Sequence, residues 1–310
     1  MGEPNAKTMN GRPAAPPRST GSTAPDGASS EERTDFWHAL LRRMRTPHRP
    51  RFWFELILIA VSYKTYSLIR AAVPDQADVA LGHADSVWSF EHHLHLAVEH
   101  GVNHAVNSVT WLIVGMNYYY ATLHFIITIG VLVWLYFAHP GRYGPARLVL
   151  FCTTWLALIG FWAFPLAPPR LMVGGNFIDT VRVHNTWGSM SQGSLSKVSN
   201  QYAAMPSMHI GWSLWCGLTV AMLAKPLWVR IIGALYPLFT LSVIISTGNH
   251  FWLDAVGGVV CLAIGYSIVY VIYGKWVYRL PRYPENSVSA WRLFRLPSRD
   301  KTAVDQPRKP

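Results

Sequence analysis

Six long apolar segments constrain the fold of this chain more than any other feature. Runs of roughly 18 to 25 apolar residues are long enough to cross a bilayer as helices. Of the 310 residues, 51% are hydrophobic and only 14% are charged, so lipid is expected to cover the apolar excess. The sequence therefore predicts an all-α, polytopic membrane protein with six transmembrane spans, near 52–72, 112–138, 146–167, 207–224, 228–247 and 251–274.

The distribution of lysine and arginine predicts how these spans are oriented. Short loops rich in these residues stay on the cytoplasmic side. Four basic clusters lie on one face of the predicted bundle: Arg42, Arg43, Arg45, Arg49 and Arg51, then Arg142 and Arg147, then Lys225 and Arg230, then Lys275, Arg279 and Arg282. Both termini are therefore predicted to be cytoplasmic, with the first outer loop outside, and the plasma membrane is the expected location.

The two ends of the chain differ from the predicted spans in composition. Residues 1–50 are expected to be a disordered cytoplasmic tail, because the first 35 are rich in Pro, Ser, Thr, Ala and Gly and lack an apolar run. Residues 51–276 are expected to form the six-span domain, and 277–310 a basic cytoplasmic tail. The net charge of +11 lies largely in these flanks, which indicates anionic lipid rather than nucleic acid as the partner.

Two histidines and one carboxylate open apolar segments on the predicted outer side. His209 ends a Pro-Ser-Met-His motif, and His250 and Asp254 form a His-x-x-x-Asp motif. Residues four apart on a helix share a face, so Asp254 can hold the imidazole of His250 in one tautomer and orientation. That arrangement prepares a histidine as a nucleophile. A phosphate between the two motifs would be attacked by one histidine while the other protonates the leaving oxygen.

The phosphate would also need groups that bind its negative charge. Helix starts favour anions, which points to the backbone around Ser207 and Met208. Arg170, Arg182 and Lys197 lie in the outer loop between spans three and four, where few cations are expected. A guanidinium can bind phosphate in a bidentate manner, so Arg170 is the main candidate. The alternative is that these three cations contact lipid headgroups or solvent.

The pattern of Pro-Ser-x-His opening one span and His-x-x-x-Asp opening another about 40 residues later resembles the type 2 phosphatidic acid phosphatase (PAP2) superfamily. Within it, the chain is most similar to the inositol phosphorylceramide synthase branch. The resemblance covers roughly residues 55–275. It includes Ala167-Pro168-Pro169-Arg170, Asp179-Thr180, Ala203-Ala204-Met205, and Asn117, Tyr120, His124 and Phe125.

The resemblance implies a six-helix core in which His250 attacks phosphorus, Asp254 orients it and His209 protonates the leaving group. A phosphohistidine intermediate would form. Water would then make the enzyme a phosphatase, and an alcohol such as inositol or a sugar would make it a phosphotransferase; both remain open. The substrate would be a membrane lipid phosphoester, and this chemistry requires no metal or other cofactor.

Departures from the superfamily pattern affect the expected phosphate site. The usual Gly before the first histidine is Met208, the usual Ser-Arg pair is Val243-Ile244, and the Lys-x6-Arg-Pro element is absent. These losses argue for the synthase-like branch. They also assign phosphate binding to Arg170, with Arg182, Lys197 and Lys64 as further candidates.

His124 lies inside the second span, where an ionisable group is a functional candidate by default. Asn117 and Tyr120 share nearly the same helical face, so all three are expected to line the substrate site. The alternative for His124 is a packing role. Lys64 lies in the outer third of the first span, and for it snorkelling to the interface is the default and phosphate contact the second interpretation.

The first outer loop carries a dense cluster of ionisable side chains: Glu91, His92, His93, His95, Glu99, His100 and His104. His100 and His104 have the spacing of helical zinc ligands. The favoured interpretation is an amphipathic interfacial helix, from about 86 to 110, that lies over the site and recognises lipid. Two alternatives to an enzyme therefore remain, a metal-binding membrane protein and a non-catalytic lipid-binding or transport protein.

Overall fold

The computed structural model describes residues 50–72, 76–186 and 201–284. These residues form helices and helical turns without a strand, apart from an isolated β-bridge between Leu166 and Ala203. The prediction of an all-α protein is thus confirmed for the described part of the chain. Most of the two predicted tails, namely residues 1–49 and 285–310, lies outside the described residues, and so does Lys197.

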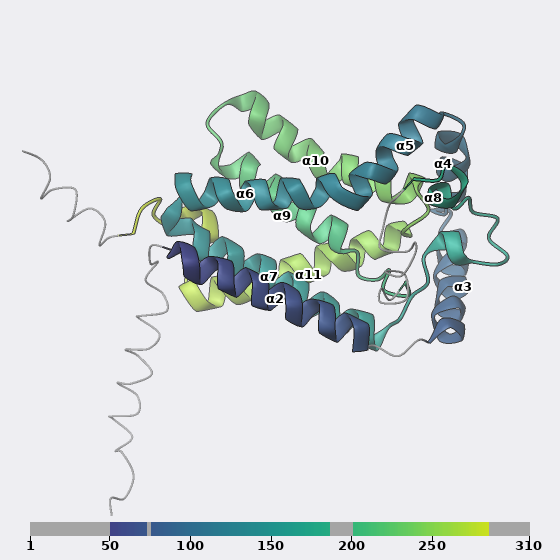
Figure 1. The fold of residues 1–310 in the computed structure, drawn as a ribbon, viewed down its shortest axis with the longest axis horizontal. Coiled ribbons are helices and arrows are strands. Elements are labelled where there is room, and N and C mark those ends of the chain that lie inside the picture. The colour runs from purple at the N-terminus through teal and green to yellow at the C-terminus, as the bar shows by residue number, and fades with distance from the viewer. Residues whose placement is uncertain (1–49, 73–75, 187–200, 285–310) are drawn as a thin grey trace, which may run out of the picture. The chain divides into compact units, whose positions relative to one another are not determined.

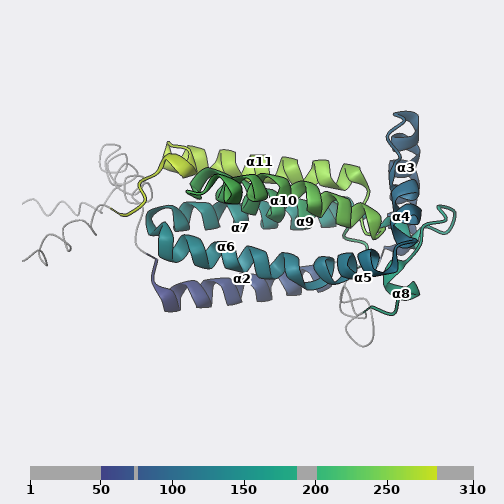
Figure 2. The same ribbon diagram turned by 90° about the horizontal axis from the view of Figure 1, so that it is seen from above.

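Six long helices run side by side, as Figures 1 and 2 show. They are α2 (Phe52–Ala72), α6 (His124–Ala138), α7 (Pro140–Ala163), α9 (Met208–Leu223), α10 (Leu227–Ser246) and α11 (Trp252–Tyr273). A shorter helix, α5 (Thr110–Tyr118), continues into α6 through a π-helical turn at Tyr119–Leu123. Helix α9 contacts α6, α7, α10 and α11, so it is enclosed by the other helices.

Within the described residues, four helical runs are long and apolar enough to cross a membrane: Thr110–Ala138, Pro140–Ala163, Leu227–Ser246 and Trp252–Tyr273. The chain is therefore an integral membrane protein. Helix α9 has only 16 residues, or about 24 Å at 1.5 Å per residue, against a hydrocarbon core of about 30 Å. The described apolar part of α2, Phe52–Ser62, is also short. The count of six spans stays a prediction.

Three further helices lie together at the end of the bundle where α9 and α11 begin (Figures 1 and 2). They are α3 (Ala77–His93), α4 (Glu99–Asn107) and α8 (Thr180–Val183). The prediction of a single interfacial helix from 86 to 110 was wrong, because the helix is interrupted between the end of α3 and the start of α4. His95 has a φ of 56° there, a left-handed conformation that cannot continue a right-handed helix.

The residues that follow position 276, the expected end of the six-span domain, pack against the bundle. A helical turn at Val277–Arg279 packs against the bundle, and Val277 and Tyr278 are buried. The hydroxyl groups of Tyr278 and Thr219 are 3.0 Å apart. Further along, the Gly141 N–H donates to the Arg282 carbonyl over 2.9 Å. Packing and backbone hydrogen bonds thus hold residues 277–282, which had been expected to belong to the tail.

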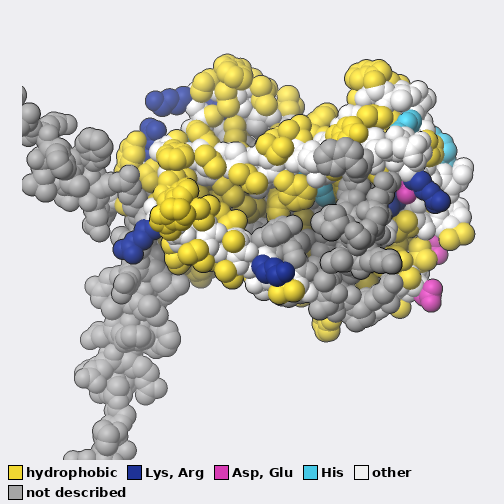
Figure 3. All heavy atoms as spheres, in the orientation of Figure 1, with side chains coloured by type: hydrophobic (Ala, Val, Ile, Leu, Met, Phe, Trp, Pro, Cys, Tyr) yellow, Lys and Arg dark blue, Asp and Glu magenta, His cyan; other side chains and the backbone are white. Residues whose placement is uncertain are grey.

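Hydrophobic side chains cover much of the face drawn in Figure 3, whereas histidine and acidic side chains gather at the end occupied by α3, α4 and α8. Large apolar side chains are exposed along the parallel helices, including Trp53, Phe137 and Trp162. Such a surface is suited to contact with lipid. Cys152, Cys216 and Cys261 are free thiols within helices.

Candidate active site

The turn between α10 and α11 places His250 against Asp254. Gly248 has a φ of +64°, a conformation that glycine adopts without strain and that ends α10. The Nδ1 atom of His250 is 3.0 Å from Oδ2 of Asp254, which is fully buried. The Phe251 N–H donates to the same oxygen over 3.1 Å. A carboxylate only accepts, so Nδ1 of His250 is the donor and Nε2 carries the lone pair.

The lone pair on Nε2 of His250 remains available. This atom is buried and has no hydrogen-bond partner among the described residues, and the residue itself is only 4% exposed. A neutral imidazole that donates from Nδ1 to a carboxylate has its more basic nitrogen at Nε2. The arrangement is that of a histidine prepared to act as a nucleophile.

The ring of His209 lies opposite, in the first turn of α9. Its centroid is 5.6 Å from that of His250. Tyr120 stacks on His209 with 4.0 Å between centroids, and His124 is 4.8 Å from it. Tyr120 lies within the π-helical turn, a feature that alters which face a helix presents and is frequent at functional sites. The structure thus brings Tyr120 and His124 next to His209.

A direct backbone contact ties the two histidine motifs together. The Ser207 N–H donates to the backbone carbonyl of Asp254 over 2.9 Å. That N–H is engaged within the protein in this structure, and a phosphate contact of Ser207 stays a prediction. The fully buried Oγ of Ser207 has no hydrogen-bond partner among the described residues, and Met208 begins α9 beside it.

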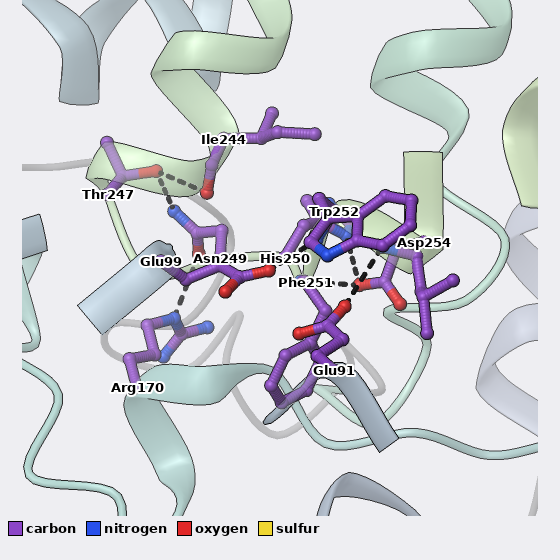
Figure 4. A network of polar contacts seen from close by, with 11 residues as sticks. Glu91, Glu99, Arg170, Ile244, Thr247, Asn249, His250, Phe251, Trp252 and Asp254 are labelled. Carbon is purple, nitrogen blue, oxygen red and sulfur yellow. Dashed lines mark hydrogen bonds and ion pairs between the residues drawn. The ribbon is translucent and has the colours of Figure 1, made fainter. Parts of the chain in front are cut away.

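Arg170 is held beside the His250 motif by three contacts, of which Figure 4 shows the one with Asn249. Its backbone N–H donates to the Gly248 carbonyl over 3.0 Å, and its Nε donates to Oδ1 of Asn249 over 2.9 Å. Its Nη1 lies 3.7 Å from Oδ2 of Asp179. Asn249 in turn donates to Oγ1 of Thr247 over 2.8 Å. Asn249 was not among the predicted site residues, and its position next to His250 was the available signal.

Two further expected phosphate ligands, Arg182 and Lys64, make no contact with the histidines among the described residues. Arg182 is exposed on α8, and its side chain makes no polar contact among the described residues. Lys64 is exposed on α2 and likewise has no polar contact within the described ranges. Asn117 does not face the histidines with its amide, which instead bonds Oγ1 of Thr180 over 2.8 Å and Oγ1 of Thr186 over 3.0 Å. Asn117 therefore anchors the loop that contains α8.

The cluster of ionisable side chains between Glu91 and His104 contains histidines and two glutamates, which differ in their surroundings. His92 and His93 point their Nδ1 atoms at carbonyls of their own helix, and His104 contacts the Asn176 carbonyl through Nε2 over 2.8 Å. Glu91 and Glu99 are fully buried against the start of α11. Within the described ranges, no group of three or more His, Cys, Asp or Glu side chains is arranged to hold a metal ion.

Glu91 and Glu99 had been considered only as members of that cluster. Burial, and then the neighbouring Glu99 carboxyl, raises the pKa of Glu91 to about 9. A carboxyl group with that pKa carries a proton at neutral pH. The separation of eight residues between Glu91 and Glu99 does not predict that they are neighbours. They lie on different helices, and the turn between α3 and α4 brings them close together.

Comparison with known proteins identifies a family for this chain. A family model described as the PAP2 superfamily matches residues 85–268, which is more than half of the chain. The matched range contains His209, His250, Asp254 and Arg170, and it leaves out Lys64. No match was found among curated proteins or among solved structures.

Proposed function

Because the chain belongs to the PAP2 superfamily, we propose that it is an integral membrane phosphatase or phosphotransferase that acts on a lipid phosphoester through a phosphohistidine intermediate. The general activity follows from the family. The observation that supports the mechanism is the pair of His250 and Asp254, 3.0 Å apart and facing His209. In this proposal His250 is the nucleophile, Asp254 orients it and His209 is the general acid.

In the first step, Nε2 of His250 attacks the phosphorus atom. An N–P bond forms, the bond between phosphorus and the leaving oxygen breaks, and protonated His209 gives its proton to that oxygen. The imidazole of His250 becomes positively charged, and the carboxylate of Asp254 stabilises this charge from the Nδ1 side. The leaving lipid alcohol departs neutral.

In the second step, neutral His209 takes a proton from water or from an alcohol. The oxygen of that molecule attacks phosphorus, the N–P bond breaks, and His250 returns to its starting state. Water yields a free phosphate group, whereas an alcohol yields a new phosphoester. His209 ends the cycle protonated, ready for the next leaving group.

Arg170 is the proposed phosphate clamp. A guanidinium has five N–H donors; Asn249 takes the one on Nε, and Asp179 lies near Nη1. The remaining donors are available for phosphate oxygens. The N–H of Met208, in the first turn of α9, is a further donor in this proposal, because the first N–H groups of a helix have no partner within it. Arg182, Lys197 and Lys64 remain secondary candidates, and Tyr120, His124 and Asn117 line or support the site.

The branch and the membrane placement belong to the same proposal. Met208 and Val243-Ile244, which depart from the wider pattern, support the inositol phosphorylceramide synthase-like branch, with inositol or a sugar as acceptor. The distribution of lysine and arginine supports cytoplasmic termini and an extracytoplasmic site. The apolar runs support six spans, and the plasma membrane is the proposed location. The catalytic domain then begins near residue 51 and extends past 276.

The first experiment measures phosphate release from phosphatidate and from polyprenyl mono- and diphosphates, in detergent without added metal. Purified wild type is compared with His250→Ala, and a second panel pairs phospholipid donors with inositol or sugar acceptors. Loss of the nucleophile is expected to lower kcat by at least about 10³-fold. His92→Ala is the matched control, since His92 is exposed and bonds only its own helix.

The outcomes separate the function classes. Release of phosphate identifies a phosphatase, and formation of a new phosphoester identifies a transferase. Full activity in His250→Ala would show that another group is the nucleophile. No turnover of either panel by a folded wild type would overturn the enzyme proposal in favour of lipid binding or transport, and a loss of stability on chelation would favour a metal-binding protein.

A further inference from the structure

Three consecutive backbone N–H groups at the start of α11 are bound by three different carboxyl groups. The Phe251 N–H donates to Asp254, the Trp252 N–H to Oε1 of Glu99 over 2.9 Å, and the Leu253 N–H to Oε1 of Glu91 over 3.1 Å. Figure 4 shows these side chains around the first turn of the helix. The first N–H groups of a helix have no partner within it, so two residues of the first outer loop cap the helix that carries Asp254.

The two glutamates are placed for sharing a proton. Both are fully buried, and each uses one oxygen for α11. The other oxygen, Oε2, has no hydrogen-bond partner in either residue among the described part of the chain. The carboxyl group of Glu99 also neighbours that of Glu91 closely enough to raise its pKa. Two buried neighbouring carboxylates repel each other, whereas one proton shared between them removes that repulsion.

We propose that Glu91 and Glu99 share one proton and act as positioning residues, which hold the first turn of α11 and thereby the pair of His250 and Asp254. This inference rests on the proposed function for its kinetic test. The glutamates are fully buried, so they act through the helix start and not on substrate.

The shared proton makes the arrangement sensitive to alkaline pH. The titratable groups that face Glu91 are Glu99 from α4 and Asp254 from α11, with His250 bonded to Asp254. The pKa of Glu91 is raised to about 9, so the proton is held at neutral pH and lost as the pH rises through that value. Loss would place three carboxylates together and push the carboxyl groups away from Trp252 and Leu253. In the pH profile, kcat is then expected to fall as the pH rises through about 9, which is the alkaline limb of that profile.

Glutamine substitutions test this proposal without changing the size of the side chains. In Glu91→Gln or Glu99→Gln, one amide replaces the protonated carboxyl and keeps one acceptor and one donor. Each single variant is expected to keep kcat within a factor of about three and to lack the alkaline limb. The double variant places two NH₂ groups opposite each other, and kcat is expected to fall about 10²-fold with an unchanged KM.

The control variant is Asp85→Asn, which removes an exposed carboxylate from the same helix as Glu91. It is expected to leave kcat and the pH profile unchanged. Equal losses in the single and double glutamine variants, or an alkaline limb that survives in both single variants, would overturn the shared proton.

Two further measurements need no substrate, and the infrared measurement separates this inference from the proposed function, because it does not require a phosphate-binding site. Infrared spectroscopy at neutral pH is expected to show a protonated carboxyl band in the wild type that is absent from Glu91→Gln; a missing band in the wild type would refute the shared proton. Orthovanadate takes up the five-coordinate geometry of a transferring phosphoryl group. Its binding is expected to weaken in the double variant and not in the single ones, and equal binding in all variants would refute the positioning role.

Discussion

At the scale of single residues, Asp254 makes the contacts that connect the two histidine motifs in the candidate site. Asp254 receives Nδ1 of His250 and the Phe251 N–H on one side-chain oxygen, while its backbone carbonyl receives the Ser207 N–H. One residue therefore contacts His250, the proposed nucleophile, together with the start of α11 and the start of α9. A shift of any of these contacts would change the distance between His250 and His209.

Arg170 and Arg182 provide a test of the phosphate clamp at this scale. Arg170→Ala is expected to lower kcat/KM about 10²-fold, since it removes a preorganised cation from the developing charge. Arg182→Ala is the matched control, because this side chain is exposed and makes no polar contact among the described residues. It is expected to keep kcat/KM within about threefold. Equal losses in both variants, measured with the same lipid substrate, would contradict the assignment of Arg170.

At the scale of elements, the active site is formed where α9 meets α11. A Cβ atom at Gly258 would lie 2.4 Å from the backbone oxygen of Ser207, so this close approach requires glycine. Pro206 lies in the same contact, with its ring atoms closest to Gly160 of α7 and Gly257 of α11. The start of α9 is thus packed between two helices, which positions His209 relative to His250.

Gly258→Ala is expected to displace the start of α9 and to lower kcat about 10-fold or more, because small misplacements of catalytic groups are costly. The apparent melting temperature in detergent should fall as well. Gly130→Ala, on α6, is the control, since a Cβ there meets nothing within 4 Å. Unchanged kcat in Gly258→Ala, or the same loss in the control, would show that this helix contact does not position His209.

At the scale of the whole molecule, the two ends of the bundle are expected to face opposite sides of the membrane. Asp85 lies on α3 beside the candidate site, and Lys225 lies between α9 and α10 at the other end; both are exposed. Single cysteines at these positions, in a chain whose three native cysteines are replaced by alanine, test the orientation. A membrane-impermeant thiol reagent is expected to label Asp85→Cys in intact cells, and Lys225→Cys only after the membrane is opened. The reverse pattern would refute an extracytoplasmic site.

Much of the helical framework was predictable because it depends on local pattern. The apolar run expected at 228–247 corresponds to α10 at Leu227–Ser246, and the run at 251–274 corresponds to α11 at Trp252–Tyr273. Long apolar periodicity specifies a helix without reference to distant residues. The break at His95 and the turn at Val277–Arg279 were not predictable in this way, because packing against other helices decides both.

The candidate site likewise contains some contacts that local sequence predicts and others that it does not. The sequence by itself determined the helical membrane character and the closeness of His250 to Asp254, because four residues of separation keep the two side chains near each other. The expected placement of both residues on one helix was wrong: His250 lies just before α11, and the turn after α10 brings its ring to Asp254. Only the tertiary structure decided that Tyr120 and His124 lie against His209, that Arg170 and not Arg182 lies beside Asn249, and that Glu91 and Glu99 cap α11. These contacts join residues far apart in the chain, and their energies depend on burial, which no local pattern specifies.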